Sequence, residues 1–487
     1  MAWQDLREFL DMLEKQGALH RISVEVDPVL EIAEITARMS TSPGGGSALL
    51  FERVKGSRFP VATNVFGSER RVCAGLEVSG LADLTRRVTD LLDQADAPST
   101  GDPGADLSGN PEFARFRPTA VDDGPCREVL EQVADLSAYP FIKSWPGDGG
   151  PECQGRALTL PIVFTRDPDT GCTNCGIYRV QLFSPDTVGI GWRQGSGGAG
   201  HLEKFRACGE RMPVAIVLGG DPATLFSALL PLPESIDEMQ FAGFLRGEPV
   251  QMVRCPASGI MVPAHAEMVV EGYIDPFETR RGGEYGNHTG FYVPARTVPV
   301  MHVSSITRRR DPVFMETVIG PPPMEDCHMA KAAERIMLSF TRRDLPEIVE
   351  INLPLEGIFH GAAIVSIDKT LPGQARNVME RIWAGGWLSG SRLLVVVDRD
   401  CDVHDLSRSF WKVLNSVEWQ RDMVFAGIPG EERPEKNGFP FGGKLGIDAT
   451  RKLPGEGSID PWPDEIRMNG SIRELVSSRW HDYGFRD

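Results

Sequence analysis

Apolar residues in the first hundred positions follow helical spacing in some stretches and strand patterns in others. Two stretches place them three or four residues apart, as on one face of a helix: Leu6, Phe9, Leu10 and Leu13 in the first, Ile32, Ile35 and Met39 in the second. A glycine-rich break at 43–47 precedes a short apolar strand at 48–51, and another helical pattern covers 81–92. Proline, glycine and aspartate gather at 97–104, which marks a domain boundary. These patterns predict an N-terminal α/β domain over residues 1–110.

Strand patterns dominate residues 111–325. The runs at 158–164 and 177–183 flank the turn signal Asp167-Pro168-Asp169-Thr170-Gly171, so they predict a hairpin. A β-rich central domain, built as a barrel or a sandwich, is the natural interpretation. Further apolar strands are expected at 214–218, 268–274 and 298–306.

Strands alternate with helices over residues 326–487. A helix is predicted at 327–340, and β-branched strands at 362–367 and 393–397 enclose a helical pattern at 374–387. This alternation predicts a C-terminal α/β domain. With 487 residues the chain exceeds the ~250–300 at which one core stops growing, so we expect a mixed α/β (α+β) fold of three domains.

The composition is that of an ordinary globular enzyme, and it argues against several partners. The 51 lysines and arginines face 68 aspartates and glutamates, a formal net charge of −17, which disfavours nucleic acid and anionic membranes as partners. A few arginines in a cleft can still bind an anionic ligand. The nine cysteines are scattered and odd in number. Neither a signal peptide nor an apolar run of ~18–20 residues is visible, so we expect a cytoplasmic protein with reduced thiols.

The segment at 173–179, Thr-Asn-Cys-Gly-Ile-Tyr-Arg, places polar side chains in an otherwise apolar strand. A strand does not need these residues to pack, so they indicate a ligand or a turn. Asn174 and Arg179 are five positions apart and would point to opposite faces of a flat strand. We therefore expect the backbone to turn near Gly176, or Asn174 to belong to the preceding loop.

Two nearby patterns each allow more than one interpretation. Cys172 and Cys175 form a CxxC, which can be a redox pair or half of a zinc site, although the lack of a second CxxC favours two packed or exposed thiols. The glycine-rich residues 195–200 can bring backbone N–H groups to a phosphate, or can be a flexible connection. They match neither of the common nucleotide-binding glycine motifs.

Seven short motifs occur in one order along the chain. They are N-x-G-I-Y-R at 174–179, the stretch 192–201, GGDPA at 219–223, D-E-x-x-F-A-G at 237–243, VVEGYI at 269–274, GNHTG at 286–290 and GGKLGIDAT at 442–450. This arrangement resembles the UbiD family of decarboxylases, which use prenylated FMN. The similarity runs through nearly the whole chain and rests on several separate motifs.

The resemblance implies a split β-barrel that binds prenylated FMN and a C-terminal domain that forms a homodimer or higher homo-oligomer. A flavin prenyltransferase would supply the cofactor. In the family an asparagine, a histidine and a glutamate hold a divalent cation that bridges to the flavin phosphate, and these positions match Asn174, His201 and Glu238. Such ligands suit Mn²⁺ or Mg²⁺ better than zinc, and K⁺ is a further candidate. The residues implied to contact the flavin or its phosphate are Ile177, Tyr178, Arg179, Trp192, Arg193, Gly197, Gly198 and Lys444.

The resemblance also implies that Arg179 faces the substrate carboxylate, where a guanidinium fork fits well. The family supplies two acids in the pattern E-G-P-[FY]-G-[ED], but those positions are Gly282 and Asn287 here, and a carboxamide cannot act as an acid. Glu284 lies two residues after Gly282, hence on the same side of an extended segment. We hypothesise that Glu284 takes the acid/base role and that Asn287 hydrogen-bonds the substrate.

Other interpretations of this region stay open. Glu284 can instead form an ion pair with Arg280 or Arg281. His288 and His360 are candidates for the pocket, although each can equally be a histidine packed in a core.

The leading hypothesis is a reversible non-oxidative decarboxylase of an aromatic, heteroaromatic or α,β-unsaturated carboxylic acid. It would react through a covalent adduct with prenylated FMN, which serves as the electron sink. Loss of the usual acids suggests a substrate unlike those of the ubiquinone pathway and points to a tailoring step in secondary metabolism. A second hypothesis is a flavin-binding protein with lost or altered turnover, consistent with Gly282 and Asn287. A third is a redox protein that uses the CxxC pair.

Overall fold

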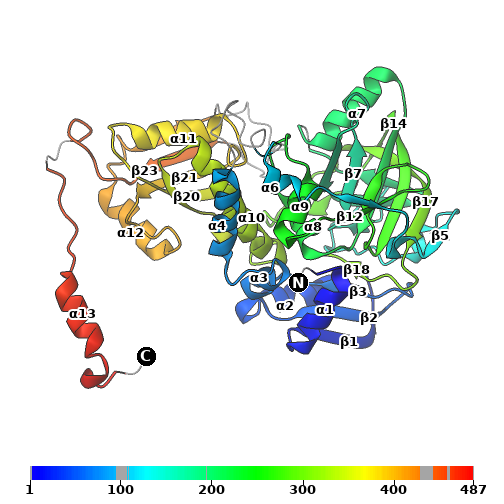
Figure 1. The fold of residues 1–487 in the computed structure, drawn as a ribbon, viewed down its shortest axis with the longest axis horizontal. Coiled ribbons are helices and arrows are strands. Elements are labelled where there is room, and N and C mark those ends of the chain that lie inside the picture. The colour runs from blue at the N-terminus through cyan, green and yellow to red at the C-terminus, as the bar shows by residue number, and fades with distance from the viewer. Residues whose placement is uncertain are drawn as a thin grey trace.

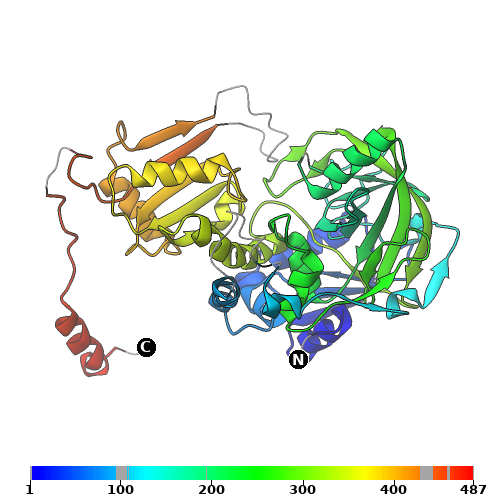
Figure 2. The ribbon, with the colours of Figure 1, turned by 45° about the horizontal axis from the view of Figure 1, so that its top comes forward.

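The computed structural model describes residues 3–94, 107, 109–193, 195–427, 443–457 and 461–485; the predicted boundary at 97–104 and Gly442 lie outside them. The chain has the mixed α/β fold predicted, with an N-terminal sheet, a large central sheet and a C-terminal sheet (Figure 1). The long helix α10 (Glu325–Asp344) lies between the central and C-terminal sheets (Figure 2).

The N-terminal sheet has the strand order β1 (Leu19–Val26), β2 (Ala48–Val54), β3 (Val61–Thr63) and β18 (Phe314–Met315). The helices of this region are α1 (Leu6–Lys15), α2 (Glu31–Ser40), α3 (Glu69–Gly75) and α4 (Leu81–Asp93). Helix α1 begins where the Asp5 carboxylate accepts a hydrogen bond from the Glu8 N–H. Because β18 comes from the end of the central region and pairs with β3, the two regions are joined through this sheet.

The central region is built on a nine-stranded sheet. Its order is β6–β9–β10–β17–β14–β11–β7–β8, and β5 pairs with β17. The bounds are β5 (Val129–Glu131), β6 (Ala157–Leu158), β7 (Ile162–Arg166), β8 (Thr173–Ile177), β9 (Val180–Ser184), β10 (Thr187–Ile190), β11 (Met212–Leu218), β14 (Met268–Arg281) and β17 (Thr297–Arg308). Two smaller units complete it: a sheet of β4 (Thr119–Val121), β12 (Gln251–Arg254) and β13 (Met261–Pro263), and a hairpin of β15 (Tyr285–Gly286) and β16 (Tyr292–Val293).

The predicted hairpin between 158–164 and 177–183 is confirmed, although both runs break into two strands. Leu158 pairs through β6 with β9, whereas β7 pairs with β8 across the predicted turn. Pro161, which separates β6 from β7, has no N–H to donate to a ladder. The second run breaks between β8 and β9, and this break contains Arg179.

The helices of the central region are α6 (Pro111–Ala114), α7 (Gly197–Cys208), α8 (Pro222–Leu229) and α9 (Glu238–Arg246). Two of them, α7 and α9, carry motifs identified in the sequence. Helix α7 begins inside the glycine-rich stretch predicted as a loop, directly after Ser196. The Asp237 carboxylate accepts a hydrogen bond from the Gln240 N–H at 2.8 Å, which makes Glu238 the first residue of α9. Short 3₁₀ turns lie at Pro43–Gly45, Pro125–Arg127, Leu136–Ala138, Leu355–Gly357 and His481–Tyr483.

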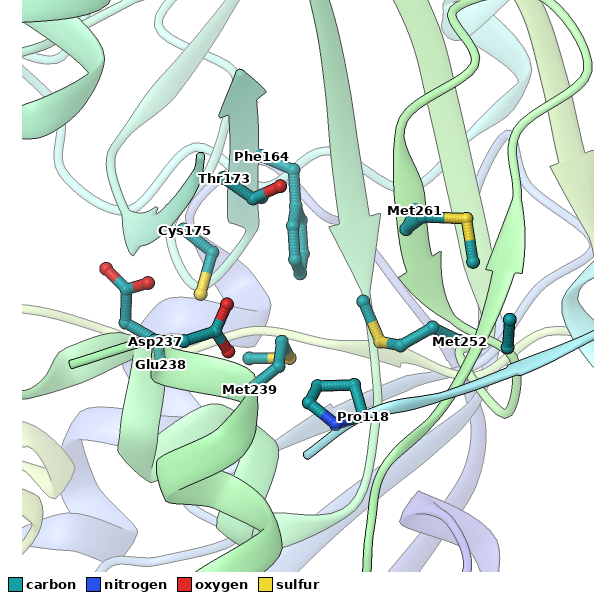
Figure 3. Close-up of a pocket in the computed structure, with 10 residues that line it drawn as sticks. Pro118, Phe164, Thr173, Cys175, Asp237, Glu238, Met239, Met252 and Met261 are labelled. Carbon is teal, nitrogen blue, oxygen red and sulfur yellow. The ribbon is translucent and has the colours of Figure 1, made fainter. Parts of the chain in front are cut away.

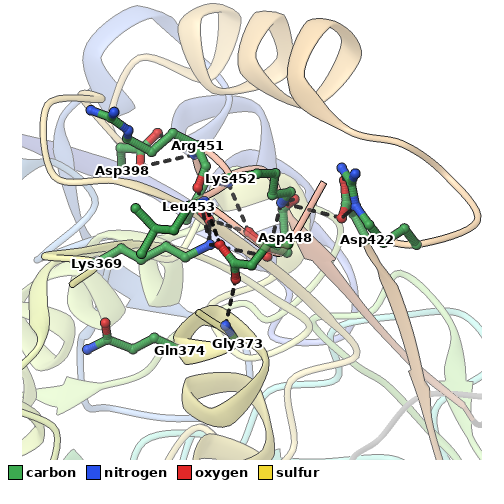
Figure 4. Close-up of polar contacts among 12 residues, drawn as sticks. Lys369, Gly373, Gln374, Asp398, Asp422, Asp448, Arg451, Lys452 and Leu453 are labelled. Carbon is green, nitrogen blue, oxygen red and sulfur yellow. Dashed lines mark hydrogen bonds and ion pairs between the residues drawn. The ribbon is translucent and has the colours of Figure 1, made fainter. Parts of the chain in front are cut away.

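The C-terminal sheet has the order β19 (Ile348–Asn352), β20 (Ala362–Ile367), β21 (Leu393–Asp398), β23 (Lys444–Asp448) and β22 (Met423–Ala426). Its helices are α11 (Gln374–Ala384) and α12 (Leu406–Ser416). Two lysines with almost fully buried side chains hold one end of the sheet together (Figure 4). Lys369 Nζ lies 2.7 Å from Glu456 Oε2, and Lys452 Nζ lies 3.0 Å from Asp448 Oδ2. Burial of these ammonium groups is tolerated because each is paired.

The last described segment, residues 461–485, extends away from the rest of the chain (Figure 1). Its helix α13 (Gly470–Ser478) has no buried residue, and the apolar side chains of Ile472 and Leu475 are exposed. Within the described ranges, no helix is long and apolar enough to cross a membrane.

Candidate active site

Strand β8 carries the polar segment that the sequence singled out. Asn174 lies within the strand, opposite Thr165 of β7, so it does not belong to the preceding loop. The strand ends before Tyr178, not at Gly176. Gly176 has another role: a Cβ there would lie 2.8 Å from the Tyr178 ring, which folds back over it. Because the strand breaks before Arg179, the opposite-face argument for a flat strand does not apply.

Asn174 faces the first turn of α7. A Cβ at Gly197 would lie 2.0 Å from Asn174 Oδ1, so only glycine allows the helix to approach this closely. Asn174 Nδ2 is buried and has no hydrogen-bond partner in the described part of the chain. Unpaired buried polar atoms are rare in folded proteins, so this amide indicates a ligand.

His201 lies one turn further along α7 and contacts the same strand pair. Its Nδ1 is 2.9 Å from the hydroxyl of Thr165, the strand partner of Asn174. Its Nε2 lies 3.9 Å from a carboxylate oxygen of Asp167. Burial lowers the pKa of His201, so the imidazole is neutral at neutral pH, which is the form that binds metals.

Glu238 lines a cavity of about 280 Å³. In Figure 3, Asp237 and Glu238 lie beside Cys175 at one end of the cavity, and Met252 and Met261 lie at the other. Burial raises the pKa of the Glu238 carboxyl to about 8, and the charge of Asp237 adds to the rise. A carboxyl in this environment would be stabilised in its charged form by a bound cation.

The three predicted metal ligands come from β8, α7 and α9. The Cys175 N–H lowers the pKa of Glu238 by hydrogen bonding, so this carboxyl reaches the residue next to Asn174. An amide oxygen, an imidazole and a carboxylate form a set that fits Mn²⁺ or Mg²⁺. Across the described ranges, no three His, Cys, Asp or Glu side chains are grouped to hold a metal, so the Asn174 amide is indispensable to this set.

Replacing Gly197 by alanine is expected to lower manganese affinity at least tenfold while the fold is kept. The added methyl group would lie 2.0 Å from Asn174 Oδ1 and would displace the amide. Gly200 of the same helix has nothing within 4 Å of an added Cβ, so Gly200→Ala is the matched control and should stabilise α7 by up to ~1 kcal/mol. Metal content after dialysis measures the effect, and equal content in both variants would contradict this arrangement.

Residues around Trp192 form the predicted flavin side of the site. The Trp192 ring is buried and lies edge-on to that of Tyr178, with 6.3 Å between ring centroids. Its Nε1 has no hydrogen-bond partner among the described residues, and a Cβ at Gly198 would lie 2.5 Å from it. Ile177 closes β8 opposite Ile162 of β7. An unpaired indole N–H beside a glycine helix start is suited to an anionic or oxygen-rich ligand.

Positive charge gathers around His288. Burial, together with the charges of His360, Arg193 and Arg179, lowers the pKa of His288 to about 2. The His288 ring centroid lies 4.8 Å from that of His360 and 5.0 Å from that of Phe359, both of the C-terminal region. His288 Nε2 is buried without a partner in the described ranges. The central and C-terminal regions therefore meet at a neutral imidazole flanked by two arginines.

Lys444 is placed apart from the other predicted cofactor residues. It begins β23 in the C-terminal sheet, where it pairs with Ala426. The other predicted residues lie in the central region.

Arg179 lies over the Tyr285 ring, with 4.5 Å from Cζ to the ring centroid. The space beside it, at the buried Gly282, is taken by Gln181: a Cβ at Gly282 would lie 2.5 Å from Gln181 Oε1. The Gln181 amide is fixed by Gly283, to whose oxygen it donates at 3.0 Å and from whose N–H it accepts at 3.1 Å. A glutamine amide therefore stands where the family pattern would place a carboxylate.

Glu284 does not share a side with Gly282. Strand β14 ends at Arg281, and the backbone of Glu284 pairs instead with Gly149 through hydrogen bonds of 2.9 and 2.8 Å. Gly282 is buried whereas Glu284 is exposed, so the premise of one extended segment is wrong. Nor does Glu284 pair with Arg280 or Arg281 within the described residues, since Arg280 contacts Glu278 at 3.3 Å.

Asn287 is buried next to His288. Its Oδ1 accepts a hydrogen bond from the His288 N–H at 2.7 Å. The NH₂ group of Asn287 could donate to a substrate, and Oδ1 keeps a second lone pair.

Sequence reasoning missed two residues near Arg179. Gln181 follows Arg179 by two positions, a spacing that places both on one face of a strand and that could have pointed to it. Glu316 is fully buried, and the sequence signal for it is faint: a Glu-Thr pair inside the apolar run 313–319.

The CxxC pair is not arranged as a redox centre. Cys172 is exposed, Cys175 is buried, and both are free thiols. Burial raises the pKa of the Cys175 thiol well above its ordinary value, and the charges of Glu238 and Asp237 add to the rise. A reactive thiolate needs the opposite shift, so two packed or exposed thiols is the better interpretation.

Three family models match consecutive parts of the chain. They describe the N-terminal domain (residues 10–91), the Rift-related domain (119–322) and the C-terminal domain (327–449) of 3-octaprenyl-4-hydroxybenzoate carboxy-lyase, UbiD. An uncharacterised protein of Archaeoglobus fulgidus is 42% identical, with 99% of each chain covered.

Solved structures of a decarboxylase and of a UbiD-class enzyme are similar to nearly the whole chain. Vanillic acid decarboxylase of Sedimentibacter hydroxybenzoicus in its closed form has a TM-score of 0.85 at 25% identity, with 100% of each chain covered. The UbiD-class enzyme HmfF of Pelotomaculum thermopropionicum, solved with FMN, has a TM-score of 0.77 at 27% identity, with 97% of this chain and 99% of that chain covered. An evolved dimeric form of HmfF was solved with prFMN.

Proposed function

Because the chain belongs to the UbiD family of carboxy-lyases, we propose that it removes CO₂ reversibly and without oxidation from an aromatic, heteroaromatic or α,β-unsaturated carboxylic acid, using prenylated FMN. The observation that carries this proposal is the position of Arg179. Its guanidinium lies over the Tyr285 ring, and its charge lowers the pKa of His288. The Nε2 atom of His288 is buried and has no hydrogen-bond partner among the described residues. A planar cation at such a junction is suited to hold a substrate carboxylate through two parallel hydrogen bonds.

The cofactor side of the proposal is supported by atoms that lack a protein partner. Asn174 Nδ2 and Trp192 Nε1 are buried and unpaired in the described residues, and both lie against the glycines that begin α7. Asn174, His201 and Glu238 would hold Mn²⁺ or Mg²⁺, which would link the protein to the flavin phosphate. When bound, prenylated FMN supplies an electron sink for the substrate by bonding to it covalently.

The residues of this chain would bind and orient the acid. Arg179 holds the carboxylate, and the fixed amide of Gln181 keeps the adjoining surface neutral. The NH₂ group of Asn287 donates to the substrate. Phe359 and His360 cover this end of the site from the C-terminal region, and the water they exclude would otherwise weaken the Arg179–carboxylate contact.

The class of substrate is proposed from the neighbours and from the missing acids. The name of the vanillic acid decarboxylase supports an aromatic acid. Similarity to decarboxylases over the whole chain does not favour the alternative of a flavin-binding protein without turnover. Because Gly282 and Asn287 replace the usual acids, we place the reaction in a tailoring step of secondary metabolism, in the cytoplasm. All nine cysteines are free, which supports a reducing compartment.

Co-expression with a flavin prenyltransferase tests the proposed function. The purified protein should carry prenylated FMN and manganese, and should release CO₂ from at least one acid of a panel of aromatic, heteroaromatic and α,β-unsaturated acids. In D₂O, the reverse reaction should exchange hydrogen for deuterium at the product carbon that had carried the carboxylate. A fully loaded protein that neither releases CO₂ nor exchanges hydrogen with any member would contradict the proposal.

We also propose that the chain forms a homodimer through its C-terminal region, and deletion of residues 461–487 is expected to yield a monomer. The last described segment, residues 461–485 (the arm), exposes Ile466, Ile472 and Trp480. The C-terminal domain exposes Leu414 and Phe425, so both parts would bury apolar surface in an assembly. Light scattering coupled to size-exclusion chromatography measures the mass. The full-length chain at the same concentration is the control, and an unchanged subunit number after deletion would contradict the role of the arm.

A further inference from the structure

Glu316 is a buried acid at the junction of the N-terminal sheet and the central region. It follows β18, is 0% exposed, and donates its N–H to the Ala62 carbonyl of β3 at 2.9 Å. Its Oε2 accepts hydrogen bonds from both the N–H and the hydroxyl of Thr159, each at 2.7 Å. Its Oε1 is buried and has no hydrogen-bond partner among the described residues. Oε2 is therefore fixed by Thr159, and the Leu160 N–H also lowers the pKa of the carboxyl by hydrogen bonding, whereas Oε1 meets no donor at full hydrogen-bond geometry in the described part of the chain.

Thr159 places this carboxyl beside Arg179. The last residue pair between β6 and β9 joins Leu158 to Val180. The ladder ends at this pair, and Thr159 and Arg179 are the next residues beyond it on the two strands, so they are neighbours across the end of the ladder. The electrostatics agree, because the Arg179 charge lowers the pKa of Glu316. Glu316, bound to Thr159, thus lies near the group proposed to hold the substrate carboxylate.

We propose that Glu316 is the catalytic acid that delivers a proton to the carbon from which CO₂ departs. The proposal rests on the decarboxylase function proposed above and assigns a role that Gly282 and Asn287 cannot fill. Glu284, the acid expected from the sequence, is exposed and held by its backbone at another loop. Glu316 has a fixed orientation, an oxygen that meets no donor at full hydrogen-bond geometry among the described residues, and a position near Arg179.

The proton balance of this step closes with Glu316 and solvent. The bond between carbon and carboxylate breaks, CO₂ leaves, and the electron pair stays with the substrate. The O–H bond of Glu316 then breaks as its proton forms the new C–H bond. Glu316 is left as a carboxylate and regains its proton from water before the next turnover, so one acid anion and one proton yield one product and CO₂.

The surroundings of Glu316 couple this proton to the substrate. Burial raises the pKa of Glu316 to about 7, against the lowering effects of Thr159 and of Arg179. A substrate carboxylate on Arg179 offsets the guanidinium charge, so Glu316 holds its proton more firmly while substrate is bound. When CO₂ leaves, the Arg179 charge is exposed again and favours proton release from Glu316 at the moment when the carbon needs it.

Glu316→Gln tests the proposal, because glutamine keeps the shape and an oxygen for Thr159 but has no acidic proton. Decarboxylation and hydrogen–deuterium exchange of the product should both fall about 10²–10⁴-fold, the usual contribution of a general acid. The wild-type rate should decline as pH rises through about 7, where Glu316 loses its proton, and the residual rate of the variant should lack this limb. Flavin and manganese content should be unchanged.

Glu271→Gln is the matched control for a purely structural role. Glu271 is also 0% exposed, and its Oε2 accepts hydrogen bonds from the Ala257 N–H, the Ser258 N–H and the Ser258 hydroxyl, all away from the site. The Glu271→Gln variant should be less stable than the wild type and should decarboxylate at the wild-type rate. Exchange by Glu316→Gln within fivefold of wild type, or loss of exchange in Glu284→Gln alone, would overturn the assignment.

A carboxyl titration separates failure of this assignment from failure of the proposed function. In protein labelled with carboxyl-¹³C glutamate, one signal besides that of Glu238, which is identified by its loss in Glu238→Gln, should titrate near pH 7, should be missing in Glu316→Gln, and should move when a benzoate-type acid binds. If no acid of the panel reacts but this signal behaves as described, the proposed function fails and Glu316 is still the acid of the pocket. A wild-type protein without such a signal would overturn the assignment of Glu316.

Discussion

Arg179→Ala is expected to lower kcat/KM for decarboxylation about 30- to 5,000-fold. Removal of one partner of a buried, hydrogen-bonded charge pair costs about 2–5 kcal/mol, and each 1.4 kcal/mol is tenfold. The loss should appear because Arg179 holds the carboxylate in the orientation from which CO₂ leaves, beside Tyr285 and Glu316. Arg179→Lys should recover only part of the rate, since an ammonium group lacks the planar fork that binds both carboxylate oxygens.

Arg280→Ala is the matched control for this prediction. Arg280 lies on the same sheet, but its side chain is 37% exposed and pairs with Glu278 at the surface, an interaction of less than ~1 kcal/mol. Steady-state kinetics with equal flavin loading measure both variants. If Arg179→Ala kept wild-type kcat/KM with its cofactor bound, Arg179 would not be the carboxylate-binding residue. If only flavin loading fell, Arg179 would act on the cofactor instead.

The sequence was sufficient to predict the elements with strong periodicity. The helical pattern from Leu6 to Leu13 is α1, and the strand expected at 298–306 lies within β17. The hairpin at 158–183 was predicted correctly, but its interruption was not, because an apolar run looks the same whether it forms one strand or two. The break shows only in the pairing, where the register shifts between Leu158↔Val180 and Ile162↔Ile177, and local spacing does not encode contacts between strands.

The candidate site divides in the same way. Asn174, His201 and Glu238 were predicted from motifs shared with the family, and each lies in or next to β8 or β7. Glu316 was missed because its partner Thr159 is 157 residues away. Glu284 was chosen on the assumption of one extended segment, but β14 ends first, and burial depends on what the segment meets afterwards. Motifs identify residues within one segment, whereas the acid of this site depends on contacts between segments.

Glu238→Gln is expected to remove the bound metal and with it tight flavin binding. Loss of a group that only hydrogen-bonds to a metal ligand already costs about 10- to 100-fold in metal affinity, so loss of the carboxylate itself should lower manganese affinity at least 100-fold. In wild-type protein, Mn²⁺ at 100 times its dissociation constant should stabilise the fold by about 2.7 kcal/mol, seen as a higher Tm. In Glu238→Gln the Tm should not respond to Mn²⁺, because the amide provides a neutral and weaker ligand.

Without metal, Glu238→Gln should be at least as stable as the wild type, the reverse of the order expected with Mn²⁺. Burial of the Glu238 carboxyl opposes its charged form, as the rise of its pKa shows, and a neutral amide avoids that opposition. Metal-free Glu238→Gln should therefore melt at or above the temperature of the metal-free wild type. Glu234→Gln, an exposed position four residues earlier, is the control and should keep both the metal and the Mn²⁺-dependent rise in Tm. Stoichiometric manganese in purified Glu238→Gln would show that the cation is held elsewhere, because the set built on Asn174 and His201 needs this carboxylate as its only negative ligand.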